Sequence, residues 1–85
     1  MKQEEIFGKL IQQERKAKKI SQEKLAKLTG LDRTFISLIE NGKRSPTLST
    51  ILKISSALEI APSELFSVYE SKAVYHVKKG GKNAK

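Results

Sequence analysis

The sequence predicts an all-α protein built from five short helices, and three observations support this prediction. A chain of 85 residues can build one small domain around a single core at most. Its apolar residues recur every three or four positions over most of the first 58 residues, which is the period of an amphipathic helix. In addition, Ser21, Asp32 and Thr47 each precede one of these stretches, where a side-chain oxygen can cap a helix N terminus.

The first two helices are expected over residues 3–18 and 22–28. Gly8 is the weak point of the first, because glycine costs up to about 1 kcal/mol against alanine inside a helix. It therefore lies either near a frayed start or where another element packs closely. Gly30 suits the left-handed conformation that ends the second helix. The residues expected to face inward are Ile6, Phe7, Leu10, Ile11 and Ala17 on the first helix, and Leu25, Ala26 and Leu28 on the second.

A third helix is expected over residues 33–40, directly after the N-cap Asp32. Two short helices joined by a tight turn with a glycine are the outline of a helix-turn-helix. The helical stripe of apolar residues covers only one side of the third helix. That stripe contains Leu31, Phe35, Ile36 and Ile39, and the opposite side carries Arg33, Thr34, Ser37 and Leu38.

Two further helices and a different C-terminal segment follow. The fourth helix begins after Thr47, and the fifth begins at Pro62 and ends near Phe66. We expect residues 1–67 to form the domain and residues 68–85 a short basic C-terminal extension that is partly disordered, residues 80–85 in particular. Residues 68–78 could form either a strand or a helix. Inward-facing residues are expected to be Leu48, Ile51, Leu52, Ser55 and Leu58, then Leu65 and Phe66; Val74, Tyr75 and Val77 suggest the strand.

Composition favours a polyanionic partner and offers little chemistry. Seventeen Lys and Arg against nine Asp and Glu give a net charge of +8, shared equally between residues 1–67 and 68–85. The chain has no cysteine, and its one histidine, His76, has no ligand neighbours, so we expect no metal, no cofactor and no enzymatic activity. With no apolar run of about 20 residues and no export signal, the sequence predicts a soluble, cytoplasmic, nucleoid-associated protein without membrane contact.

Three sequence motifs follow one another along the chain: S-Q-E-x-L-A from Ser21, I-S-x-I-E-N-G-K-R-x-P from Ile36, and L-x-T-I-L-K-I-x-x-A-L from Leu48. In this order they resemble the helix-turn-helix of the Cro and CI repressor family, also called the xenobiotic-response-element family, and the match extends from about Gly8 to Phe66. The resemblance implies a five-helix, lambda-repressor-like DNA-binding domain that regulates transcription, as a repressor for example, and is usually dimeric. Within the family, LDRTFIS is similar to the recognition helix of restriction-modification controller proteins.

The resemblance also implies roles for individual residues. The third helix would enter the major groove of double-stranded DNA, with Arg33 free to donate two hydrogen bonds to one guanine. The alternative for Arg33 is a surface residue balanced by Asp32, and for Gln22 a solvated first-turn residue. The expected base contacts are Arg33, Thr34, Ser37 and Leu38, the expected phosphate contacts are Gln22, Asn41, Lys43 and Arg44, and the expected structural ion pair is Arg15 with Glu40.

Two departures from the family pattern bear on this interpretation. Gln12 stands where relatives often have arginine, which removes one possible phosphate contact. Lys19 stands where they have glycine, which requires either a strained Lys19 or a different helix ending.

One short helix reads too few base pairs to find a site in a genome, so a homodimer on a pseudo-palindromic operator is expected. The alternative is an antitoxin-type repressor that also binds a toxin protein. The dimer interface is expected at Ile60, Pro62, Leu65, Val68 and Tyr69, although Leu65 and Phe66 could instead close the core and leave the partner contact to Val68, Tyr69, Val74, Tyr75 and Val77.

Overall fold

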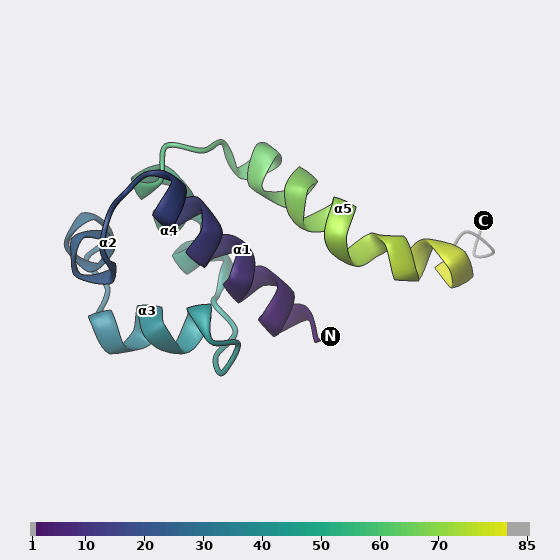
Figure 1. Ribbon diagram of the computed structural model, residues 1–85, viewed down its shortest axis with the longest axis horizontal. Helices are drawn as coiled ribbons and strands as arrows, with labels where there is room; N and C mark the ends of the chain where they lie inside the picture. The colour runs from purple at the N-terminus through teal and green to yellow at the C-terminus, as the bar shows by residue number, and fades with distance from the viewer. Residues whose placement is uncertain (1, 82–85) are drawn as a thin grey trace.

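The computed structural model describes the backbone of residues 2–81 and the side chains of residues 2–71. In this part of the chain the secondary structure is entirely α-helical, which confirms the predicted fold class (Figure 1). The first four helices begin where expected, and the first three end within about a residue of the expected positions. The five helices are α1 (Gln3–Ala17), α2 (Gln22–Thr29), α3 (Arg33–Glu40), α4 (Leu48–Ala57) and α5 (Pro62–Gly81).

The expected cap residues define the helix ends. The side chains of Ser21, Asp32 and Thr47 each accept a hydrogen bond from a backbone N–H in the first turn of α2, α3 and α4, at 3.0, 2.9 and 3.1 Å. Gly30 follows α2 with a φ of +76°, the left-handed conformation expected there. Local capping chemistry therefore fixes the turn between α2 and α3 on both sides.

A single core holds the five helices together. α3 packs against α1 and α2, while α4 contacts α2 and α5, and α5 also contacts α1. Every helix contributes at least one fully buried apolar side chain. The core residues are Phe7, Leu10, Ile11, Leu25, Ile36, Ile39, Ile54, Leu58 and Leu65.

Part of the predicted inward-facing set was wrong. On α4 the buried row contains Ile54 with Ser55 and Leu58. The predicted inward face of this helix, which included Leu48 and Leu52, fitted the same helical period. The sequence alone could not show which of the two faces is buried. Ala17 is exposed as well. The other misassigned residues are Leu28, Leu48, Leu52 and Phe66, which are 52, 66, 45 and 39% exposed.

The prediction that the fifth helix ends near Phe66 was also wrong, as was the strand considered for residues 68–78. α5 continues to Gly81, and its second half extends away from the other helices (Figure 1). No glycine or proline stands between residues 66 and 79 to stop the helix, so the strand preference of Val74, Tyr75 and Val77 is overridden. Of the segment expected to be disordered, residues 80–81 lie in α5 and residues 82–85 lie outside the described residues. None of the described helices is long and apolar enough to cross a membrane.

Gly8 lies where the backbone of α1 packs directly against the end of α3. A Cβ atom built on Gly8 would come 2.1 Å from the carbonyl oxygen of Ile39 and 2.9 Å from that of Glu40. Of the two explanations for this glycine, close packing is therefore correct. The contact brings the end of α3 directly against the first helix.

Within residues 2–81, two residues other than glycine adopt the left-handed conformation. Lys19 and Glu59 follow α1 and α4 with φ of 60° and 56°. In each case the next N–H donates back to a carbonyl five residues earlier, from Ile20 to Arg15 and from Ile60 to Ser55, as in a Schellman ending. Of the two alternatives for Lys19, the strained left-handed conformation is therefore the correct one, and α1 keeps the ending that a glycine at this position would give.

Candidate nucleic-acid interface

The outer side of α3 is polar and open at its N-terminal end. Arg33 and Thr34 are exposed, and one turn later Ser37 and Leu38 are partly exposed. On the opposite side Ile36 and Ile39 are buried in the core. α3 lies at the edge of the helical assembly (Figure 1). The four residues expected to contact bases therefore share one accessible surface.

The loop after α3 is held against this helix. The backbone N–H of Lys43 donates to the carbonyl of Leu38 over 2.8 Å, and Asn41 Nδ2 donates to Ser37 Oγ over 3.4 Å. The Arg44 guanidinium lies 5.4 Å from the centre of the Phe35 ring, a cation–π distance. Asn41, Lys43 and Arg44 are all exposed. Two cationic side chains thus lie beside the exposed side of α3.

Arg15 and Glu40 form a buried ion pair. Arg15 Nε donates to Glu40 Oε2 over 2.7 Å and Nη2 donates to Oε1 over 3.0 Å, a bidentate geometry. Arg15 Nη1 also donates to the Ile20 carbonyl over 2.8 Å. The side chains are 9 and 0% exposed. One pair therefore joins α1, the turn before α2 and the end of α3, and it removes the Glu40 charge from the surface.

Gln22 has a partner that sequence reasoning did not find. Its Nε2 donates to Glu40 Oε1 over 3.0 Å, although Gln22 was expected to contact phosphate. The two residues are 18 positions apart on different helices, so no local pattern could have connected them.

Sequence reasoning also missed two lysines on α2. Lys24 and Lys27 line an open groove between α2 and the start of α3, together with Arg33. Their spacing of three residues puts both on one side of the helix and could have identified them. Three cationic side chains therefore share this groove with one carboxylate, that of Glu23.

The residues expected at a dimer interface differ in what they offer to a partner. Leu65 is fully buried in the protein's own core and has no surface available to a second copy. Ile60, Val68 and Tyr69 pack against that core but remain partly exposed, and Pro62 is exposed. The Tyr69 ring meets the Phe7 ring edge-on at 6.0 Å.

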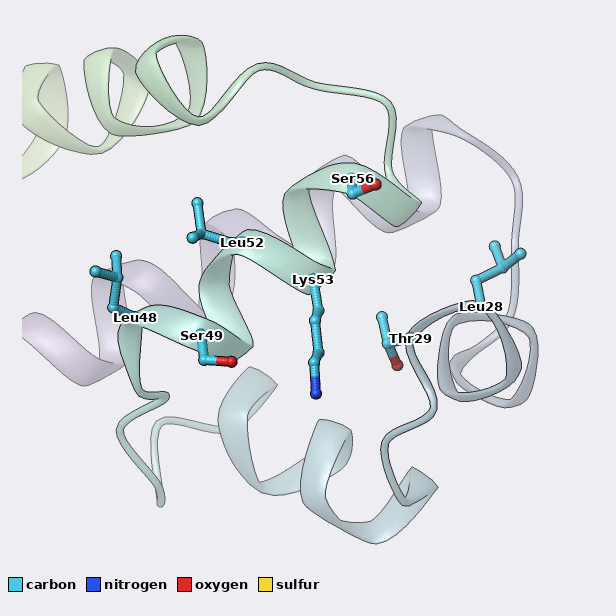
Figure 2. Close-up of a pocket in the computed structure, with 7 residues that line it drawn as sticks. All are labelled: Leu28, Thr29, Leu48, Ser49, Leu52, Lys53 and Ser56. Carbon is cyan, nitrogen blue, oxygen red and sulfur yellow. The ribbon is translucent and has the colours of Figure 1, made fainter.

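A second open groove lies between α2 and α4, away from the outer side of α3. Figure 2 shows Leu28 on one side of it and Leu48 and Leu52 on the other, with Lys53 extending between them. These exposed leucines are the ones that the sequence had assigned to the core. The groove is thus an apolar surface separate from the polar side of α3.

Comparison with known proteins identifies the family. Residues 11–65 match the family described as Helix-turn-helix. The control protein C.MunI of Mycoplasma sp is 49% identical over 65 residues, which are 75% of this chain and 88% of that protein. The control protein C.BamHI of Bacillus amyloliquefaciens is 48% identical over 61 residues, 71% of this chain and 75% of that protein.

Solved structures agree with this assignment. The restriction-modification controller protein C.AhdI from Aeromonas hydrophila matches with a TM-score of 0.71 and 45% identity, over 73% of this chain and 94% of that one. C.Esp1396I bound to a 25 base pair operator site matches with a TM-score of 0.80 and 28% identity, over 87% of this chain and 97% of that one. The chain therefore belongs to the Helix-turn-helix family and, within it, to the restriction-modification control proteins.

Proposed function

We propose that this protein is a transcriptional regulator of a restriction-modification system that binds a pseudo-palindromic operator as a homodimer. The observation that carries the proposal is the outer side of α3, where Arg33 and Thr34 are exposed on a helix anchored by Ile36 and Ile39. The operator-bound relative C.Esp1396I has the same fold and supports it. The similarity to C.MunI and C.BamHI favours a controller over an antitoxin. Such a regulator acts beside the chromosome, in the cytoplasm.

In this proposal the start of α3 reads base edges in the major groove. Arg33 donates two hydrogen bonds to O6 and N7 of a guanine, since its guanidinium fork matches that pair of acceptors. Thr34 and Ser37 bond to bases or phosphates, and the partly exposed Leu38 lies against a thymine methyl group. The buried side of α3 fixes the angle at which these side chains enter the groove.

The surroundings of α3 hold the DNA backbone. The exposed Asn41, Lys43 and Arg44 lie beside α3, as phosphate contacts must when the helix is in the groove. Gln22 contacts a further phosphate at the start of α2, where free N–H groups favour an anion. These contacts set the position of the protein, whereas the bases set its specificity.

The homodimer places two copies of α3 about 34 Å apart, one turn of DNA. The partly exposed residues of α5, Val68 and Tyr69, and the preceding Ile60 and Pro62 are the proposed contact surface. Val68→Asp puts a charge on this surface and should produce monomers in sedimentation equilibrium. Lys53→Asp, a charge change on α4, is the control and should leave the dimer intact.

Selection of bound oligonucleotides from a random pool tests the proposal as a whole. The wild-type protein should enrich a palindromic sequence, and Arg33→Ala should lose one guanine preference in each half-site. Lys53→Ala removes the same charge from α4 and should leave the selected sequence unchanged. Binding without sequence preference at moderate salt would reject the proposal.

A further inference from the structure

The hydrogen bond from Gln22 to Glu40 connects two helices that both take part in the proposed interface. Gln22 is the first residue of α2, and Glu40 is the last residue of α3. The Glu40 side chain is fully buried, whereas Gln22 is partly exposed. Gln22 is thus bonded to a buried group, although the residue itself is partly exposed.

The acceptor on Glu40 is held rigidly. Arg15 binds both carboxylate oxygens through Nε and Nη2, at 2.7 and 3.0 Å. The third nitrogen of the same guanidinium donates to the Ile20 carbonyl. Because a guanidinium is a planar fork, these three bonds fix the plane of the Glu40 carboxylate as well as its position. Gln22 therefore meets an acceptor that cannot turn.

A fixed acceptor also fixes the free side of the amide. The amide nitrogen of glutamine carries two hydrogens in one plane, so orienting one hydrogen orients the other. One N–H is donated to the buried Glu40, and the second lies on the other side of the amide nitrogen in the same plane. Among the described residues Gln22 makes no other side-chain hydrogen bond. The second N–H is therefore available to an oxygen atom outside the protein.

We propose that Glu40 is a positioning residue for DNA binding, holding the Gln22 amide so that its second N–H meets a backbone phosphate of the operator. This inference rests on the proposed function. A free glutamine side chain loses rotamer freedom when it binds, which weakens binding. The bond to Glu40 orders Gln22 when the protein folds, so less freedom is lost on DNA.

A double-mutant cycle of Gln22→Met and Glu40→Gln tests the proposal. An amide at position 40 has one oxygen and one NH2 group. With its oxygen in the place of Oε1, the NH2 group would face the Arg15 Nε donor; with its oxygen in the place of Oε2, the acceptor that Gln22 shares with Arg15 Nη2 is lost. Affinity for the selected operator is measured by fluorescence anisotropy at a temperature where all four proteins are folded. Each single variant should lose affinity about tenfold for each half-site, as for a hydrogen bond to a charged group. In the Gln22→Met background, Glu40→Gln should cost less than about twofold because its effect acts through Gln22.

Stability separates positioning from a merely structural role. Glu40→Gln should lower the free energy of unfolding in both backgrounds, since Arg15 loses its charged partner in each. Gln3→Met is the matched control, because Gln3 is the exposed first residue of α1, and it should leave affinity unchanged. An affinity loss from Glu40→Gln that is equal in both backgrounds would overturn the proposal. So would full affinity in Gln22→Met.

A measurement on the wild-type protein covers the case in which Glu40→Gln does not fold. In NMR spectra the Gln22 side-chain hydrogen that is donated to Glu40 should be protected from solvent exchange, in the free protein and on the operator alike. Loss of that protection on binding DNA would overturn the inference alone. A wild-type protein that prefers no operator sequence would overturn the proposed function as well.

Discussion

Arg15 and Glu40 are charged groups almost entirely removed from water. Taking an ion pair out of solvent costs several kcal/mol per ion, and the attraction between them offsets this only with close geometry and additional hydrogen bonds. Both are present here, because the pair is bidentate and Ile20 and Gln22 satisfy further positions. Each charge therefore depends on its partner more than on anything else nearby.

Glu40→Leu should destabilise the protein by about 3–5 kcal/mol, because it leaves the Arg15 guanidinium buried without a counter-charge. The double variant Arg15→Met with Glu40→Leu should recover much of this loss, since both charges are then absent. Urea denaturation followed by circular dichroism measures both. A double variant no more stable than Glu40→Leu alone would contradict this explanation.

Substitutions at the left-handed residues Lys19 and Glu59 should raise the free energy of unfolding. Lys19→Gly and Glu59→Gly should each stabilise the protein by about 0.5–1 kcal/mol, because glycine adopts this conformation without a Cβ clash. Thermal denaturation measures the effect. Lys16→Gly, inside α1, is the control and should destabilise by about 1 kcal/mol. Destabilisation by the first two variants would show that Lys19 and Glu59 are not strained.

The contact of α1 with α3 at Gly8 leaves no room for a side chain. The backbone of α1 at Gly8 touches the last carbonyl groups of α3. The same two helices are also joined by the ion pair of Arg15 with Glu40, and Arg15 lies about two turns after Gly8 on α1. α1 therefore acts as the support that sets the orientation of α3.

Gly8→Ala should destabilise the protein by about 3 kcal/mol, at the upper end of overpacking effects, because the new methyl group would lie against the backbone of α3. Unfolding in urea checks this. Gly30→Ala is the comparison, since nothing lies within 4 Å of the added Cβ and only the left-handed φ is penalised. That variant should lose about 1 kcal/mol. Equal losses would contradict the close contact.

Sequence patterns predicted the elements well where local chemistry decides them. The caps at Ser21, Asp32 and Thr47 and the left-handed Gly30 place α2, α3 and the start of α4 correctly. The end of α5 was missed because no glycine or proline marks a boundary near Phe66. The buried face of α4 was misassigned because two helical rows of similar apolarity compete there, and packing against α2 and α5 decides between them.

In the candidate site too, features set by local sequence patterns could be predicted, whereas those set by packing between helices could not. The outward side chains of α3 follow from one helical stripe, and the Arg15–Glu40 pair follows from the family resemblance. The bond from Gln22 to Glu40 depends on how the start of α2 meets the end of α3 in three dimensions. No spacing within the sequence encodes that meeting.

At the scale of the whole molecule, charge controls how the protein meets DNA. A net charge of +8 attracts any nucleic acid, so non-specific binding and its salt dependence are expected. Specificity must come from the small set of side chains on α3. The two contributions can be separated experimentally by removing one type of contact at a time.

Lys43→Ala should weaken binding to operator and non-operator DNA about equally. Each phosphate contact contributes about 0.9 to the slope of log affinity against log salt, so a dimer that loses two contacts should have a slope smaller by about 2. Titrations at several salt concentrations measure it. Lys53→Ala, on α4, should change the slope little. A loss confined to the operator would indicate that Lys43 reads a base.

The central claim, that α3 reads operator bases through Arg33, is tested most directly by changing one atom of the DNA. Replacing the preferred guanine with 7-deazaguanine removes the N7 acceptor and leaves base pairing intact. The wild-type protein should lose about tenfold in affinity, within the range for a bidentate contact. Arg33→Ala should bind both DNAs equally. An equal loss of affinity in the two proteins would contradict the contact between Arg33 and guanine.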